Sequence, residues 1–190
     1  MRRVALLAAL AILAGCASES AERAALAPAD AVLRAVDLQS RSPDTGFAQL
    51  NAFALEEPAL AARAAAELVD AEEDAQRYTA VYVLGLTASR PAEIEALRAA
   101  MGDTQEHIRL TAAGALIGLG ERRAIPELIR FLENPSPLPG STVRMSSLAQ
   151  DGLEAYVGEE PGDQPGGWSA WWEEHGDDLR WDPDQQRYES

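Results

Sequence analysis

The pattern of apolar and polar residues in the middle of the chain predicts pairs of short amphipathic helices. In residues 105–133, apolar side chains recur at intervals of three and four residues, which places them on one face of a helix. They form two series, which are Ala112, Ala115, Leu116 and Leu119, then Ile125, Leu128, Ile129 and Leu132. Gly120 separates the two series, so the segment predicts a helix hairpin.

The ends of these helices carry their own signals. Gly102 and Gly120 stand where a helix commonly ends in a left-handed residue. Asp103, followed three residues later by Glu106, predicts a capping box at the start of the next helix. Pro91 fits the first turn of a helix, where its missing N–H group costs nothing.

The predicted hairpin is one copy of an internal repeat. Residues 77–84 (RYTAVYVL) match residues 109–116 (RLTAAGAL) at a spacing of 32, with arginine, threonine, alanine and leucine recurring. A more divergent copy occupies 143–175, a faint one 46–70, and residues 29–38 predict a capping helix. Self-similarity at such a period indicates a repeat architecture. We therefore expect an all-α fold of three to four stacked antiparallel hairpins.

The motif Arg-x-x-Ala-x-x-Ala-Leu followed by Ala-Ile-Pro-x-Leu, clearest in residues 74–133, resembles HEAT repeats, and most closely the short bacterial HEAT-like form. The resemblance implies an α-solenoid in which each hairpin stacks on the next and the second helices line a concave face. We expect this domain at 31–175, with its best repeats at 74–101 and 105–133. The alternative is a plain helical bundle with accidental self-similarity.

The resemblance also implies a function, because a solenoid surface of this kind binds partners. The polar positions expected to be exposed on the second helices are Glu93, Arg98, Glu127 and Arg130. We interpret them as candidate partner-binding residues of a non-catalytic scaffold that mediates protein–protein interaction.

The amino terminus predicts membrane attachment through lipid. Two arginines precede an apolar run at residues 4–13, which matches a secretory signal and is too short to span a bilayer. The sequence LAGC ending at Cys16, the only cysteine, resembles the lipobox of bacterial lipoproteins. The resemblance implies a signal peptide at 1–15 and an acylated Cys16 at the head of a flexible tether, 16–30. The alternative is an ordinary signal peptide in which Cys16 is incidental.

The residue after the cysteine bears on location. Ala17 stands where an aspartate would signal retention in the inner membrane of enteric bacteria. The periplasmic face of the outer membrane is therefore favoured, within the bacterial cell envelope.

The carboxyl end is rich in tryptophan and in acidic residues. All four tryptophans, Trp168, Trp171, Trp172 and Trp181, lie in one short segment. We interpret them as a cover for the last hairpin, with Trp181 and Tyr188 folding back onto the final helix and residues 176–190 forming an acidic closing segment. The alternative is an aromatic patch for a glycan, a peptidoglycan fragment or a partner peptide.

Composition argues against several other functions. A net charge of −15 opposes binding to nucleic acid, whose phosphates are contacted by lysine and arginine. With only two histidines and no converging set of ligands, neither a metal nor a cofactor is expected. His107 is expected at the surface, and no nucleophile is paired with a base. A related HEAT-like branch attaches bilins to antenna proteins, but nothing in residues 74–133 favours such an enzyme.

Overall fold

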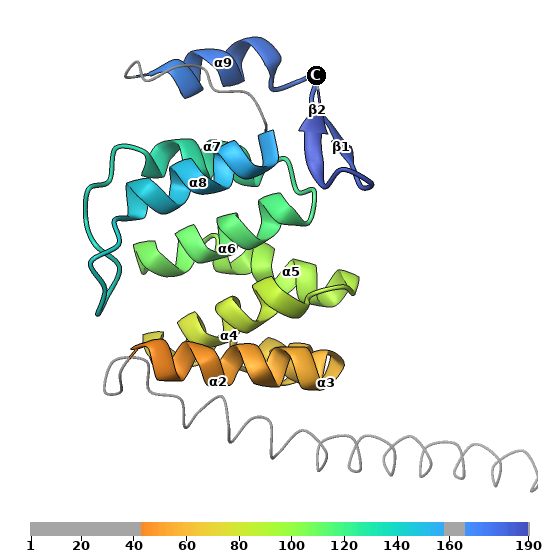
Figure 1. Cartoon of the computed structure of the whole chain (residues 1–190), viewed down its shortest axis with the longest axis vertical. Helices are drawn as coiled ribbons and strands as arrows, with labels where there is room; N and C mark the ends of the chain where they lie inside the picture. The colour runs from red at the N-terminus through yellow and green to blue at the C-terminus, as the bar shows by residue number, and fades with distance from the viewer. Residues whose placement is uncertain (1–42, 158–165, 190) are drawn as a thin grey trace, which may run out of the picture.

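The computed structural model describes residues 43–157 and 166–189, and they form a stack of helix hairpins (Figure 1). The helices are α2 (Pro43–Glu56), α3 (Pro58–Leu68), α4 (Asp74–Thr87), α5 (Pro91–Ala100), α6 (Glu106–Gly118), α7 (Ala124–Phe131), α8 (Met145–Val157) and α9 (Gly167–His175). The first six pair in chain order as three hairpins, and α8 and α9 follow, each packed on α7, which confirms the predicted all-α solenoid. The expected signal peptide, tether and first capping helix fall in residues 1–42, outside the described part.

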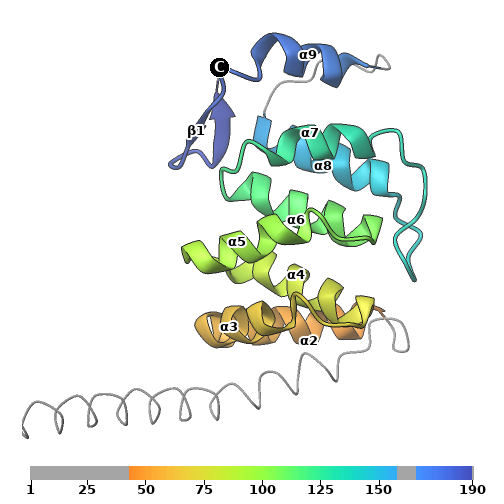
Figure 2. The same cartoon turned by 180° about the vertical axis from the view of Figure 1, so that it is seen from behind.

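The hairpins are arranged in two layers. The first helices, α2, α4, α6 and α8, form the layer that faces the viewer in Figure 1, and the second helices α3, α5 and α7 face the viewer in Figure 2. Helix α4 packs against α3 and α6, and α6 packs in turn against α5, α7 and α8. Contacts therefore run between neighbouring hairpins, as in a solenoid.

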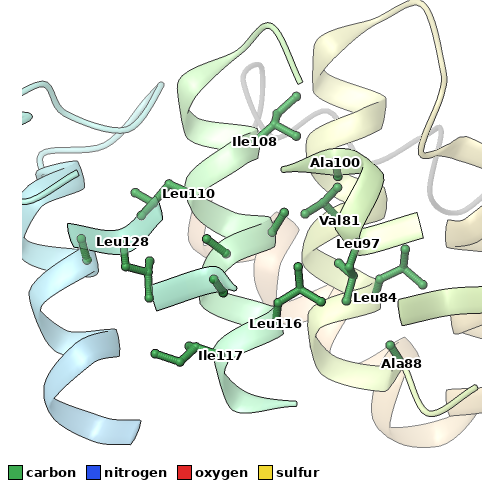
Figure 3. Close-up of a cluster of buried hydrophobic side chains, with 14 of the residues drawn as sticks. Val81, Leu84, Ala88, Leu97, Ala100, Ile108, Leu110, Leu116, Ile117 and Leu128 are labelled. Carbon is green, nitrogen blue, oxygen red and sulfur yellow. The ribbon is translucent and has the colours of Figure 1, made fainter. Parts of the chain in front are cut away.

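The core lies between the layers and is made of aliphatic side chains (Figure 3). Leu84 of α4, Leu97 of α5 and Leu116 of α6 are completely buried and point toward one another. Burial of a leucine contributes about 1.5–3 kcal/mol. Small residues then set the helix spacing, because a Cβ placed on Gly85 of α4 would lie 3.1 Å from the Cβ of Ala115 in α6. Gly85 and Ala115 therefore form a close contact between α4 and α6.

The helix ends differ in part from the predictions. Gly120 has a φ of +80° and ends its helix in the left-handed conformation, as predicted, whereas the φ of Gly102 is not positive. The capping box predicted for Asp103 and Glu106 is wrong. The Asp103 carboxylate instead accepts a hydrogen bond from the backbone N–H of Gln105 at 2.8 Å. It also accepts one from Arg77 Nε at 2.7 Å, and this bond lowers the pKa of Asp103.

The arginine that recurs in two copies of the repeat performs the same task in both. Nη1 of Arg77 donates to the carbonyls of Ala71 and Glu72, both at 3.0 Å. Nη1 of Arg109 donates to the equivalent carbonyl one repeat later, that of Asp103, at 2.9 Å. Because Asp103 also binds Arg77 through its side chain, the turn before α6 is tied to both hairpins. The repeated arginines are therefore structural residues.

The acidic closing segment contains a small β-hairpin that the sequence did not predict. Strands β1 (Arg180–Asp182) and β2 (Arg187–Glu189) pair antiparallel, with Trp181 opposite Tyr188. The Asp182 carboxylate accepts backbone N–H groups from the turn, the nearest at 2.8 Å. Strand β2 packs against α8, and Trp181 lies over Gly120 after α6. The segment therefore folds back onto the preceding repeat instead of the final helix.

Candidate functional site

Three of the four polar residues predicted on the second helices reach the surface. The Arg130 side chain of α7 is 74% exposed, that of Arg98 of α5 is 29% exposed, and that of Glu127 of α7 is 15% exposed. All three lie on the layer seen in Figure 2, because α5 and α7 belong to it. We define Arg98, Glu127 and Arg130 as the second-helix surface.

The fourth residue, Glu93, is not exposed, and this prediction is wrong. Its side chain is 2% exposed and folds back over the start of α5. One carboxylate oxygen accepts the backbone N–H groups of Ser89 and Arg90, each at 2.9 Å, and the other accepts Arg90 Nε at 2.7 Å. Burial acts to raise the pKa of Glu93, but these hydrogen bonds outweigh it and lower the pKa below its usual value. Glu93 is a helix cap.

Ion pairs order the exposed charges of the second-helix surface. Arg98 donates to Glu95 at 2.8 Å and makes two hydrogen bonds to Glu121 in the turn between α6 and α7. Arg130 donates to Glu127 at 2.6 Å. Exposed pairs of this kind add little stability. Their effect is to hold side chains of both signs in fixed positions on one face.

A shallow pocket lies in this surface beside the Glu127–Arg130 pair. It has a volume of about 90 Å³ and is lined by Glu106, Arg109, Glu127, Arg130, Phe131 and Asn134. The Arg109 guanidinium lies over the Phe131 ring, 5.9 Å from its centre. The volume is too small for a ligand of ordinary size, so this hollow is only a shallow depression in the protein surface.

The four tryptophans do not form one aromatic platform. Trp168 and Trp171 are 5% and 8% exposed, and their rings meet edge to face at 5.7 Å in α9, which packs on α7. Trp181 contacts Tyr188 at 5.0 Å between ring centres and is half-buried. Trp172 is also half-buried. The aromatic patch considered from the sequence is therefore divided, because Trp168 and Trp171 are buried where α9 packs.

A larger pocket forms where α9 approaches the turn between α6 and α7. It has a volume of about 440 Å³ and is lined by Glu121, Arg122, Arg123 and Trp172. Nη1 of Arg122 donates to the carbonyl of Gly176 at 2.7 Å, so the arginine connects positions 54 residues apart. In the sequence, this pocket is marked only by two adjacent arginines, Arg122 and Arg123, in an acidic chain. Their proximity to Trp172 could not be predicted, because Trp172 lies far away in the sequence.

Comparison with known families agrees with this architecture. Residues 57–148 match a family model described as HEAT repeats. The chain contains a HEAT-repeat domain. The matched residues run from the start of α3 into α8 and so include the second-helix surface. HEAT repeats commonly act as protein-interaction scaffolds and are typically non-catalytic. No curated protein matches the chain.

Within the HEAT-repeat domain, His107 is a second residue that was predicted at the surface and lies inside. It is 7% exposed, and its ring meets Tyr78 edge to face at 5.2 Å between centres. Burial lowers the pKa of His107, which favours the neutral ring. The imidazole therefore serves packing between α4 and α6.

Two further observations concern the described residues only. Among residues 43–157 and 166–189, no group of three or more His, Cys, Asp or Glu side chains could hold a metal ion. In the same part of the chain, no helix has the length and apolar character needed to cross a bilayer.

Proposed function

We propose that this protein is a membrane-anchored, non-catalytic scaffold of the bacterial cell envelope that binds a protein partner. The observation that carries the proposal is the second-helix surface of the HEAT-repeat domain, where Arg98, Glu127 and Arg130 are presented on successive hairpins. A solenoid builds such an extended surface from repeats that each contribute a few side chains.

The ion pairs of this surface suit recognition of a protein. Arg98 and Arg130 are each held by a carboxylate of the same helix, at 2.8 and 2.6 Å. Side chains that are ordered before binding lose less conformational entropy when a partner arrives. Charges of both signs in fixed positions select a partner with the complementary pattern, because mismatched charges are repelled.

Attachment to the membrane rests on the sequence around Cys16, which lies outside the described residues. Two or more acyl chains on one residue give stable anchoring, whereas a single chain is marginal. The intervening tether would hold the domain close to the lipid surface and leave its surfaces accessible. The periplasmic face of the outer membrane is the location that we propose.

The partner surface is tested by reversing one exposed charge. Arg130→Glu removes the pair with Glu127 without breaking a contact between hairpins, and Arg144→Glu, in the exposed loop before α8, is the matched control. Photo-crosslinking from the second-helix surface in the native envelope should give partner adducts that Arg130→Glu reduces and Arg144→Glu preserves. Circular dichroism checks that helicity is unchanged. Equal adduct yield from both variants would contradict this surface.

The anchor is tested separately by Cys16→Ser. This substitution should abolish labelling by a palmitate analogue and release the protein from the membrane fraction. A variant that is still labelled and retained would refute the lipoprotein assignment, while leaving the partner surface unaffected.

A further inference from the structure

The pocket beside Trp172 carries chemistry that the second-helix surface does not use. Its lining combines one indole with two guanidinium groups, those of Arg122 and Arg123, in a chain whose net charge is −15. Its volume of about 440 Å³ falls within the usual range of ligand sites, roughly 300–1,000 Å³. The pocket therefore has the size of a ligand site, with a lining that is mostly charged.

The groups that remain available in this pocket are hydrogen-bond donors. Both carboxylate oxygens of Glu121 already accept hydrogen bonds from Arg98. The Arg123 side chain is 63% exposed, and its ion pair with Glu121 is made through Nε at 3.4 Å. Nη1 of Arg122 donates to two backbone carbonyls, and its Nη2 lies 3.9 Å from the carboxylate of the exposed Asp177. A site whose available groups are hydrogen-bond donors favours a ligand that carries a hydrogen-bond acceptor.

Tyr188, on the neighbouring strand β2, is not among the residues that line the pocket. Its hydroxyl is buried and has no hydrogen-bond partner, and the whole side chain is 2% exposed. Burial raises the pKa of Tyr188. A buried polar group without a partner is uncommon in a native fold and calls for an explanation. The proposal for the pocket therefore rests on Arg122, Arg123 and Trp172, and not on this hydroxyl.

We propose that this pocket binds the free carboxyl terminus of a peptide whose last side chain is apolar. A carboxylate is the planar, two-oxygen acceptor that a guanidinium fork recognises. The half-buried Trp172 ring offers an apolar surface to the adjoining side chain. A sugar acid fits less well, because its hydroxyl groups need acceptors and the Glu121 carboxylate is already occupied by Arg98. The proposal does not depend on the second-helix surface.

The test uses the full chain and a defined probe. Isothermal titration at low ionic strength compares the tripeptide Gly-Gly-Phe with its carboxyl-terminal amide. The free acid should bind at least about tenfold more tightly, since hydrogen bonds to charged groups are the stronger class. Arg123→Gln should weaken binding of the acid by about tenfold or more, whereas Arg144→Gln, whose side chain is exposed outside the pocket, should leave it unchanged.

Three results would overturn the proposal. The acid and the amide would bind equally, Arg123→Gln would bind like the unaltered protein, or glucuronate would bind more tightly than the tripeptide. The comparison of acid with amide needs no substitution, so it stands even if a variant is poorly folded. Arg130→Glu should not change tripeptide binding, which separates failure here from failure of the second-helix surface.

Discussion

Substitution of Gly120 by alanine tests how the closing segment holds the end of the solenoid. Gly120 has a φ of +80°, a conformation that L side chains seldom adopt. A Cβ at this position would lie 2.8 Å from the Cγ and Cδ1 atoms of the Trp181 ring. Gly120→Ala therefore imposes two penalties, one on its own backbone and one on the packing of the β-hairpin.

The two penalties can be estimated separately. The left-handed conformation costs a residue with a Cβ about 1–2 kcal/mol. Displacing a packed ring by an inserted methyl group costs about 1–3 kcal/mol more. Gly140 provides the matched control, because its φ is +70° and a Cβ there would meet nothing within 4 Å. We expect Gly120→Ala to lower the free energy of unfolding by about 2–5 kcal/mol and Gly140→Ala by about 1–2 kcal/mol.

Urea denaturation followed by circular dichroism measures both values, and near-ultraviolet dichroism reports on Trp181. The difference between the two variants is the contribution of the Trp181 contact. Equal destabilisation by Gly120→Ala and Gly140→Ala would refute the reasoning, because it would mean that the hairpin does not pack on the turn after α6. Trp181→Leu in the Gly120→Ala background should recover part of the loss, since a smaller side chain admits the methyl group.

Three further perturbations have expected outcomes. Tyr188→Phe should raise the free energy of unfolding by about 1 kcal/mol, because it removes an unpartnered buried hydroxyl; a lower melting temperature would contradict this. A double-mutant cycle of Arg77→Gln with Asp103→Asn should give a coupling of about 1.5–3 kcal/mol, and additive losses would deny the contact. Burial lowers the pKa of His107 in the folded protein, so the unfolded chain binds a proton at a higher pH than the folded protein does. The free energy of unfolding should therefore fall as pH drops from about 7 to 5. His107→Gln should remove that slope, and an unchanged slope would contradict it.

The helices could be predicted from sequence because each repeat is a local unit. The periodicity of residues such as Leu116 and Leu128 records which side faces the core, and both are fully buried. Recurrence of Arg77 as Arg109 then gave the hairpin spacing without any knowledge of distant contacts. In a solenoid, neighbours in sequence are neighbours in space, so a one-dimensional pattern carries most of the fold.

The errors concern side chains whose partner lies off the helix that carries them. Asp103 was assigned to cap its own helix, yet it binds Arg77, 26 residues earlier. Glu93 was placed at the surface by its position on the helix, yet its carboxylate turns back to the backbone before α5. Proline at the first position of α5 and glutamate at the third were the available signal for that cap. His107 fills a space beside Tyr78 that periodicity cannot reveal.

The end of the solenoid and the proposed peptide pocket are built by the same contacts. Arg122 lines the pocket and also holds the carbonyl of Gly176, while Trp181 covers the turn from which Arg122 projects. A ligand that engages Arg122 would therefore bind the chain while the carboxyl-terminal segment is packed on this turn. Binding to one state stabilises that state by mass action, about 1.4 kcal/mol when the ligand is present at ten times its Kd. Gly-Gly-Phe should accordingly protect the hairpin amides of 180–189 from hydrogen exchange, whereas its amide should not.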